Sequence, residues 1–283
     1  MVYKFETIKF DLWQNGIGII TLNRPDKLNA INFQMEEDLH SLLDHLMINM
    51  NCRVLILKGA GKIFCAGIDL NEALILNSEK KPENYKKFYY LDVPEPLKRK
   101  IYHQWNISQI FVKMRRVSQP IIAVIHGPAV GGGFGFALAA DMCIVSKEAK
   151  FINAAISIGL TGADVGSSYF LPRLIGMSRA AEILYTGRAI DGREAVNIGL
   201  ALKLMDQEDL LDAAIELAEN MLAKSPLGLR MTKEAINLSL DAPSLETIIQ
   251  LENNSIVLTF SSKDGVEGLK SFLEKRKPKY PLL

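Results

Sequence analysis

The chain has 283 residues, and its 33 lysines and arginines against 32 aspartates and glutamates give a formal net charge of +1. This length buries a substantial core, and the 48% hydrophobic and 23% charged fractions argue against disorder as the dominant state. The near-zero charge offers no global attraction to nucleic acid or to an anionic membrane. Three scattered cysteines, Cys52, Cys65 and Cys143, predict neither a disulfide framework nor a zinc site. They fit a reducing compartment, so we expect a cytoplasmic protein.

The N-terminal part predicts two strands and then a helix. Residues 5–12 and 16–22 read as strands around an Asn-Gly pair, which is a hairpin signal. A polar turn over residues 22–32 follows. From Asn32 onward the period becomes helical, because four leucines fall on one face of a helix: Leu39, Leu42, Leu43 and Leu46.

The next part predicts a strand, a turn and two helices. Residues 53–58 form a short apolar run that enters a glycine-containing turn over residues 59–70, and Asp69 is expected to be the N-cap of the following helix. Residues 76–100 are dense in charge and contain three prolines, which indicates a surface excursion or a lid. A helix is expected over residues 101–117.

The stretch 121–141 is the feature around which the rest is organised. Its apolar start predicts a buried strand, and Gly131, Gly132 and Gly133 predict a tight turn. The small apolar residues after them predict a helix that starts at the glycines. The first N–H groups of a helix lack intrahelical partners and attract negative charge. The stretch therefore predicts a cradle for an anion, or for an oxygen that becomes one during a reaction. Its glycines, histidine and proline argue against a membrane span.

The pattern changes once more in the C-terminal half. Residues 179–185 and 189–200 predict helices, and residues 201–205 predict an edge strand. After that only amphipathic helical stretches follow. We therefore divide the chain into a core of residues 1–205, responsible for binding and catalysis, and a C-terminal helical subdomain of residues 206–283. An α-helical partner surface is the alternative for the C-terminal part.

Two glycine-containing turns, near residues 67 and 132, each follow a buried strand and precede a helix. If they face one pocket, each supplies a backbone N–H to the same oxygen, which is the geometry that stabilises an enolate or a tetrahedral oxyanion. The alternative is that both are packing turns. Other glycine motifs do not occur: there is no GxxxxGK[ST], no GxSxG, and Phe136 stands where GxGxxG would need its third glycine.

Five segments occur in the order LNRPDKLNAIN, KIFCAGIDL, IIAVIHGPAVGGGFGFALAADM, GSSYFLPRLIG and SPLGLRMTKEAIN. In these segments the chain resembles the crotonase superfamily, the enoyl-CoA hydratase/isomerase family, over almost its whole length. The resemblance implies an α/β fold, a spiral of repeated ββα units, whose C-terminal helices form a homotrimer or a dimer of trimers. It also implies an acyl-CoA thioester as the substrate, with coenzyme A as part of the substrate and no separate cofactor or metal.

The resemblance also implies which backbone groups hold the thioester. Carried over residue by residue, the thioester oxygen accepts hydrogen bonds from the N–H groups of Ile68, which follows Gly67, and of Gly132, the middle glycine of its turn. These two donors form an oxyanion hole.

Three further residues correspond to the family's coenzyme A site. The match at Ala66 implies that its backbone carbonyl is directed toward the adenine. Arg24 and Lys27 correspond to positions at which the family contacts the nucleotide phosphates. An ordinary solvated turn is the alternative for Arg24 and Lys27. Cys65, beside the first turn, is interpreted as a buried small apolar residue.

The resemblance breaks at the catalytic carboxylates. Hydratases of the family place one glutamate two residues past the three glycines and another about twenty residues later, where this chain has Gly135 and Ala155. Neither transfers a proton, so the two-carboxylate hydration machinery is absent. Asp164 remains close by, and its spacing to Pro172 matches the aspartate of dienoyl-CoA isomerases. Its spacing to Tyr169 also resembles the nucleophile of 4-chlorobenzoyl-CoA dehalogenases, which however carry a tryptophan at the position of Ala155.

We therefore expect an enzyme of the enoyl-CoA hydratase/isomerase type, with Asp164 as the proton carrier rather than a turn or cap carboxylate. One carboxylate suits migration of a double bond better than concerted addition of water, but hydration stays open if Asp164 positions a water. Two alternatives remain. One is a non-catalytic relative that binds acyl-CoA, or RNA, although the neutral charge disfavours RNA. The other is an acyl-CoA hydrolase that forms an acyl intermediate on Asp164. The sequence does not indicate the acyl group.

Overall fold

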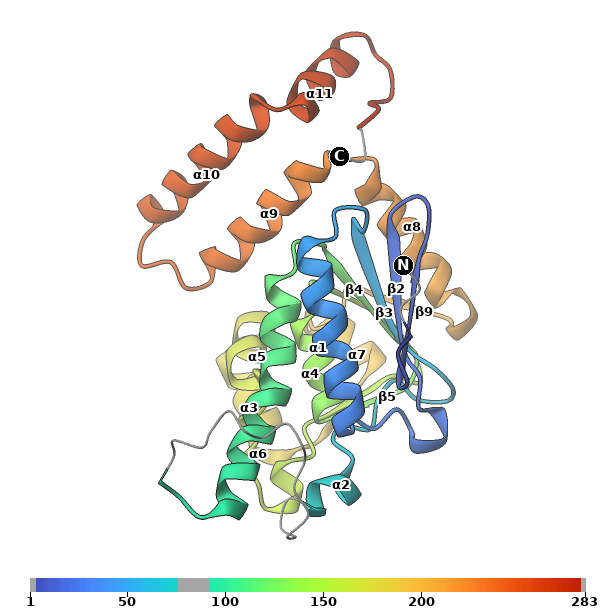
Figure 1. Cartoon of the computed structure of the whole chain (residues 1–283), viewed down its shortest axis with the longest axis vertical. Helices are drawn as coiled ribbons and strands as arrows, with labels where there is room; N and C mark the ends of the chain where they lie inside the picture. Colours follow the sequence, from blue (N-terminus) through green and yellow to red (C-terminus); the bar gives the residue numbers. More distant parts are fainter. Residues whose placement is uncertain (1–3, 76–91, 281–283) are drawn as a thin grey trace.

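Two β-sheets form the framework of the molecule (Figure 1). The computed structural model describes residues 4–75 and 92–280. In this part of the chain the larger sheet has the strand order β1-β2-β3-β4-β6-β9 and the smaller sheet the order β5-β7-β8. The strands are Ile8–Leu12 (β1), Ile17–Leu22 (β2), Val54–Gly59 (β3), Ile121–Ile125 (β4), Pro128–Val130 (β5), Met142–Ser146 (β6), Lys150–Ile152 (β7), Ala189–Asp191 (β8) and Lys203–Met205 (β9).

Helices cover both faces of the larger sheet and continue beyond it. Among the described residues, the α-helices of the body are Phe33–Ile48 (α1), Leu70–Ile75 (α2), Glu95–Arg116 (α3), Gly132–Ala139 (α4), Ser167–Ile175 (α5), Met177–Thr186 (α6), Gly192–Asn197 (α7) and Leu210–Leu222 (α8). The C-terminal helices are Pro226–Ser239 (α9), Leu245–Phe260 (α10) and Lys263–Leu273 (α11). No helix in the described ranges is long and apolar enough to cross a membrane.

The N-terminal hairpin and the first helix agree with the sequence prediction. β1 and β2 are antiparallel, with Ile8 opposite Leu22, although β1 begins three residues later than expected. Gly16 has φ +98°, a conformation that the turn requires and that glycine adopts without a steric penalty. Asn32 caps α1, because its side chain accepts a hydrogen bond from Met35 N–H at 3.0 Å.

The central strands are buried on both faces, because alternate side chains enter two separate cores. On β3, Leu55 and Leu57 join the main core with α1 and α3, whereas Val54 and Ile56 point to the opposite face. α8 covers that opposite face. The α8 residues that pack there are Leu210, Ala214 and Ala218, each almost fully buried.

A ββα pattern repeats along the chain. β4 and β5 are followed by α4, and β6 and β7 are followed by α5. β4 and β6 are parallel neighbours in the larger sheet, and β5 and β7 are parallel neighbours in the smaller sheet. The predicted spiral of ββα units is therefore confirmed. The sequence did not predict β5 or β7, because three-residue strands are too short to show an alternating pattern.

α3 begins at Glu95, six residues before the helix expected over residues 101–117. Pro94 occupies the N-cap position, so the prolines that suggested a loop mark the start of a helix instead. The charged residues up to Lys100 thus form the first turns of α3. Residues 76–91 of the predicted excursion lie outside the described residues. α3 packs along α1 (Figure 1).

The segment expected as one helix over residues 189–200 is a strand followed by a shorter helix. Ala189–Asp191 pairs antiparallel with β7, and α7 starts only at Gly192. Asp191 caps α7 through its side chain, which accepts a hydrogen bond from Glu194 N–H at 2.8 Å. The predicted edge strand near residue 203 is confirmed, since β9 lies at the edge of the larger sheet.

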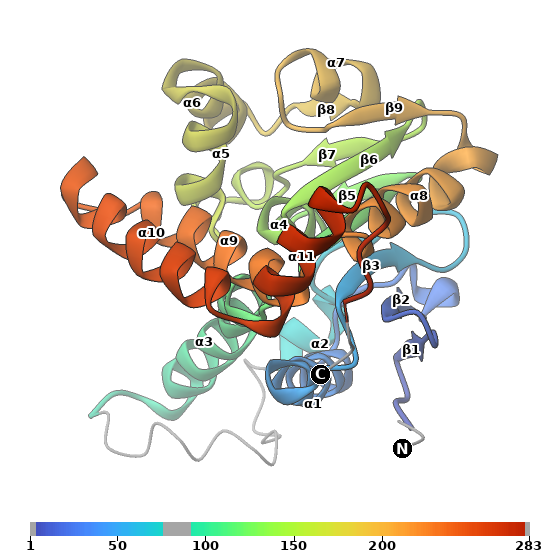
Figure 2. The ribbon, with the colours of Figure 1, turned by 90° about the horizontal axis from the view of Figure 1, so that it is seen from above.

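The helices α9, α10 and α11 project from the body (Figures 1 and 2). α9 is attached to it by the buried Lys233, whose ammonium group lies 2.7 Å from the Gln119 carbonyl oxygen and 2.9 Å from an Asp141 carboxylate oxygen. α10 packs on α9 but has no buried residue of its own. Between residues 206 and 280 the structure describes helices and no strand, as expected.

Candidate functional site

The two glycine turns lie against each other, because short parallel pairing joins the segments that lead into them. Cys65 and Ala129 form a parallel bridge, and Val130 N–H donates to the Cys65 carbonyl at 2.9 Å. This pairing aligns the turn at Gly67 with the turn at Gly132. The two turns predicted from the sequence are therefore adjacent in the structure.

Gly67 is the residue that permits the close approach. Its φ is +88°, and a β-carbon at this position would lie 2.7 Å from the Val130 carbonyl oxygen and 3.5 Å from the Gly132 nitrogen. Any other residue would therefore have to push the two turns apart. Gly132 is less constrained, because a β-carbon there would lie 2.7 Å from Cδ1 of Ile31, the end of a side chain that can move.

Ile68 N–H and Gly132 N–H have no hydrogen-bond partner among residues 4–75 and 92–280. Ile31 bonds on either side of Ile68: its N–H donates to Gly67 O at 2.7 Å and its carbonyl accepts from Asp69 N–H at 2.8 Å. Parallel pairing of this kind directs the intervening N–H to the other side of the strand. Gly132 is the first residue of α4, where an N–H has no intrahelical acceptor.

The space beside Gly135 is filled by apolar side chains. A β-carbon on Gly135 would lie 2.7 Å from Cγ2 of Val165 and 2.9 Å from Cε1 of Phe111. This is the position at which the resemblance expects a glutamate in hydratases. Ala155, at the other glutamate position, is half-buried just before a short 3-10 helix, Ile156–Ile158. The site therefore differs from a two-glutamate site in shape as well as in residue type.

Asp164 lies next to this filled space, since its neighbour Val165 contacts the Gly135 position. The Asp164 carboxylate is half-buried, and its Oδ1 accepts hydrogen bonds from Gln104 Nε2 at 2.6 Å and from Val165 N–H at 2.8 Å. Val165 has φ +45°, which is strained for a β-branched residue. A strained backbone conformation persists only where the surrounding structure imposes it, and such conformations are frequent at functional sites.

The residues expected near the nucleotide have well-defined surroundings. Arg24 is half-buried, and its guanidinium donates to the Ala30 carbonyl at 2.5 Å and to Asp69 at 3.1 Å. Lys27 is exposed in a short 3-10 helix, Pro25–Lys27. Ala66 is half-buried, and its N–H donates to the Leu28 carbonyl at 3.0 Å.

Cys65, His126 and Asp69 stand close to the two turns in the sequence. Cys65 is fully buried, and burial raises the pKa of its thiol to about 12, so it stays protonated. Burial lowers the pKa of His126, whose Nε2 lies 3.1 Å from the Gly61 carbonyl oxygen. Asp69 is the N-cap of α2, as predicted, since its Oδ1 accepts from Asn71 N–H at 3.2 Å.

Sequence reasoning missed a buried polar cluster between α1 and α3. His103 Nδ1 and Glu36 Oε1 lie 3.0 Å apart but are not aligned for a hydrogen bond, and Asn106 Nδ2 donates to Glu36 Oε2 at 2.7 Å. Glu36 is 2% exposed. Glu36 stands four residues after Asn32, and no local pattern in the sequence signals a partner on α3.

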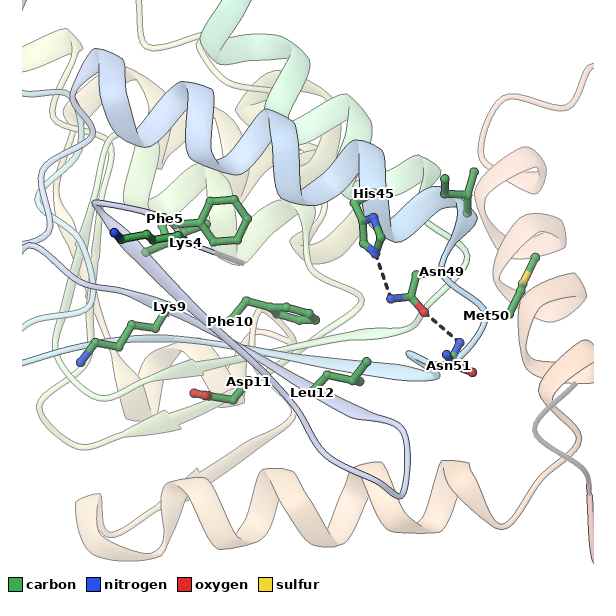
Figure 3. A pocket seen from close by; sticks show the side chains of 12 residues that line it. Lys4, Phe5, Lys9, Phe10, Asp11, Leu12, His45, Asn49, Met50 and Asn51 are labelled. Carbon is green, nitrogen blue, oxygen red and sulfur yellow. Dashed lines mark hydrogen bonds between the residues drawn. The ribbon is translucent and has the colours of Figure 1, made fainter. Parts of the chain in front are cut away.

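A cavity of about 910 Å³ lies elsewhere, between β1 and the C-terminal end of α1 (Figure 3). Lys4, Lys9 and Asp11 line it on the hairpin side, and His45 and Asn49 line it on the α1 side. The ring Nε2 of His45 lies 3.1 Å from Asn49 Nδ2. None of the residues predicted to act on a substrate lines this cavity, so it is separate from the candidate site.

A second cavity, of about 440 Å³, borders the candidate site. Its walls include Phe111 and Val165, the two side chains that fill the space beside Gly135. Arg115 also lines it and bonds with Asp141 at 2.9 Å. Among the described residues, no group of three or more histidine, cysteine, aspartate or glutamate side chains could hold a metal ion.

Comparison with known proteins places this geometry in a family. The sequence profile of the enoyl-CoA hydratase/isomerase family matches residues 13–281. A probable enoyl-CoA hydratase of Mycobacterium bovis is 36% identical, over 93% of this chain and 88% of the relative. The 1,2-epoxyphenylacetyl-CoA isomerase of Escherichia coli is 32% identical, over 94% of this chain and 95% of the relative.

Solved structures agree with these sequence comparisons. A putative enoyl-CoA hydratase from Streptomyces coelicolor superimposes with a TM-score of 0.88 at 30% identity, covering 99% of this chain and 96% of that one. The enoyl-CoA hydratase of Bacillus anthracis gives a TM-score of 0.86 at 32% identity, covering 97% and 99%. The chain has the crotonase fold and belongs to the enoyl-CoA hydratase/isomerase family, as an enzyme of the hydratase/isomerase type.

Proposed function

We propose that the protein moves the double bond of an enoyl-CoA thioester, with Asp164 as the proton carrier. The observation that carries this proposal is the filled space at Gly135. Val165 and Phe111 stand where a hydratase glutamate would reach the substrate, and Asp164 is the carboxylate beside them. With one carboxylate rather than two, removal and return of one proton is the chemistry that the residues support best.

The proposed reaction begins at the two glycine turns. Ile68 N–H and Gly132 N–H donate to the thioester oxygen, which is polarised and then carries negative charge as the enolate forms. Preorganised backbone donors of this type contribute about 3 kcal/mol each to transition-state stabilisation. The closeness of the two turns and the unpaired state of both N–H groups within the described part support this role.

The Asp164 carboxylate then transfers the proton. It removes a proton from Cα of a 3-enoyl-CoA, and the electron pair spreads over a dienolate whose negative charge lies largely on the thioester oxygen. The protonated Asp164 returns the same proton to Cγ, which leaves a 2-enoyl-CoA and restores the carboxylate. Atoms and charge balance without a cofactor, since coenzyme A is a part of the substrate.

We propose that coenzyme A lies along the turn before α1 and the turn before α2. Ala66 and Gly67 contribute backbone at the pantetheine and adenine side, and the exposed Lys27 is available to a phosphate group. Arg24 supports this surface through its bonds to Ala30 and Asp69. Those bonds make Arg24 a brace between the two turns as well as a positive charge near the nucleotide.

We also propose that the protein is a cytoplasmic homo-oligomer, a trimer or a dimer of trimers, assembled through α9, α10 and α11. The exposed apolar side chains of these helices support that assembly. The three cysteine thiols are free and buried, as expected for a protein that works in a reducing compartment.

The test is Asp164→Asn, assayed with trans-3-hexenoyl-CoA for isomerisation, with crotonyl-CoA for hydration, and with a thiol reagent for release of free coenzyme A. We expect the wild type to isomerise and the variant to lose isomerisation by at least about 100-fold. Asp206→Asn, which removes an exposed carboxylate paired with Lys147, is the matched control and should remain active.

Each other outcome of this assay identifies a different function. Full isomerase turnover by Asp164→Asn would remove Asp164 from the mechanism. Hydration that depends on Asp164 would make the protein a hydratase that uses one carboxylate, and release of coenzyme A would make it a hydrolase. Tight binding of the thioesters without any product would make it a non-catalytic acyl-CoA-binding protein.

A further inference from the structure

We infer that Gln104, on α3, is the positioning residue for the Asp164 carboxylate. The proton transfer then depends on a residue that belongs to neither glycine turn. This inference rests on the proposed role of Asp164. The bond that carries it joins Gln104 Nε2 to Asp164 Oδ1 at 2.6 Å, across 60 residues of sequence. A donor at this distance from an ionised oxygen forms a strong, directional hydrogen bond.

One face of α3 lies beside three parts of the candidate site. Residues three, four and seven positions apart share a face of a helix, which groups Gln104 with Ile107 and Phe111. Ile107 Cδ1 lies 4.0 Å from the β-carbon position of Gly132, and Phe111 contacts the β-carbon position of Gly135. The same face therefore contacts the oxyanion turn, the filled glutamate position and the proposed proton carrier.

The two oxygens of Asp164 have different surroundings. Oδ1 accepts from Gln104 Nε2 and from Val165 N–H, whereas Oδ2 has no hydrogen-bond partner among the described residues. Two donors on one oxygen fix the plane of the carboxylate and leave Oδ2 to take and return the substrate proton. Without Gln104, only the adjacent backbone N–H would orient the group.

The backbone around Asp164 is held independently of Gln104. Asp164 N–H donates to Ser167 Oγ at 3.1 Å, Ser167 N–H donates to the Asp164 carbonyl at 2.8 Å, and Ser167 Oγ donates to the Gly162 carbonyl at 3.0 Å. Gln104 itself is exposed and contributes little to the core. Its removal should therefore alter the orientation of the carboxylate and not the fold of the loop.

The experiment compares Gln104→Leu with Gln109→Leu, using trans-3-hexenoyl-CoA as the probe. Leucine keeps much of the size of glutamine but donates no hydrogen bond, and Gln109 is on the same helix but outside the site. We expect Gln104→Leu to lower kcat by about 10- to 100-fold, the effect of a misplaced catalytic group, and to leave KM within about twofold. Gln109→Leu should keep the wild-type kcat, and both variants should unfold at the wild-type temperature.

A double variant separates this inference from the proposed function. In Asp164→Asn/Gln104→Leu, the second substitution should cause no additional loss, because it acts only through Asp164. Unchanged kcat in Gln104→Leu, together with an inactive Asp164→Asn, would overturn the role of Gln104 and leave that of Asp164 intact. Equal losses in Gln104→Leu and Gln109→Leu would assign the effect to α3 packing and also overturn the inference. A fully active Asp164→Asn would overturn both proposals.

Discussion

At the residue scale, the proposed chemistry depends on the absence of a side chain at Gly135. Gly135 is in the middle of α4, where glycine costs about 1 kcal/mol relative to alanine, so a packing reason is needed for its presence. The reason is the 2.7 Å approach of Val165 and the 2.9 Å approach of Phe111. Val165, whose side chain occupies this position, has φ +45°. The absent glutamate and the strained valine beside Asp164 are thus two parts of one arrangement.

Alanine at position 135 tests this arrangement. Helix propensity alone would stabilise Gly135→Ala by about 1 kcal/mol, but overpacking costs about 1–3 kcal/mol, and contacts this short let the overpacking dominate. We therefore expect a net loss in the free energy of unfolding, measured by urea denaturation. Val165→Ala in the same chain should recover most of the loss.

Gly268→Ala on α11 is the matched control for Gly135→Ala. The nearest atom to its β-carbon position is the Tyr280 hydroxyl oxygen at 3.2 Å, the end of a side chain that can move. This change should leave stability unchanged or raise it slightly. A stabilising effect of Gly135→Ala would show that the space beside α4 is open.

At the scale of elements, α1 and α3 are joined by a polar cluster inside an apolar contact. Glu36 from α1 meets His103 and Asn106 from α3, and Phe33 packs edge-on against the His103 ring, with centroids 5.2 Å apart. Burying such groups is costly unless they are paired. The cluster therefore fixes the register of α3 along α1, and hence the place of Gln104 above Asp164.

Removal of Glu36 should be costly. Glu36→Ala leaves His103 and Asn106 buried without their partner, so we expect a loss of about 3 kcal/mol in the free energy of unfolding. Glu37→Ala, at the exposed neighbouring position, should change it by less than about 0.5 kcal/mol. Urea denaturation of both variants provides the measurement. Similar values for the two would mean that the cluster does not hold α1 and α3 together.

The sequence predicted those elements whose pattern is long enough to read. The sequence predicted the leucine face of α1, the apolar run of β4 and the helical pattern after residue 205. The start of α3 was not predicted, because Pro94 and Pro96 mark a helix start as readily as a loop. The two glycine turns were predicted from the apolar runs and glycines around them, but their contact at Gly67 depends on pairing between distant segments. The partners of Asp164 and Glu36 on α3 could not be predicted, because nothing local encodes them.

At the scale of the whole molecule, many apolar side chains of the C-terminal helices stay exposed, because the body does not cover them. No residue of α10 is buried, and Lys233 attaches α9 to the body. Exposed apolar surface of this extent marks an interaction site. The exposed apolar side chains of α9, α10 and α11 include Ile236, Leu238, Leu245, Ile249, Ile256, Val257, Leu258, Phe260, Val266, Leu269, Phe272 and Leu273.

A charge placed on this surface tests the proposed assembly. Phe260 is 62% exposed, and Phe260→Glu would bury a carboxylate if the face is an interface, so we expect a smaller sedimentation coefficient for this variant at micromolar concentration. Ile48→Glu changes a side chain that is 76% exposed on α1 and should sediment as the wild type. A wild-type protein that sediments as a monomer would contradict the assembly.

The parallel bridge between Cys65 and Ala129 also has a consequence for the order of events in folding. The two proposed N–H donors come from consecutive units of the spiral, and each unit alone would provide only one. Loop closure between these units must precede assembly of the proposed oxyanion hole, and long-range contacts of this kind form slowly. A nascent chain that ends before β5 would therefore be able to form the first hairpin and α1 but not a thioester cradle. Activity should return late in refolding, after the secondary structure.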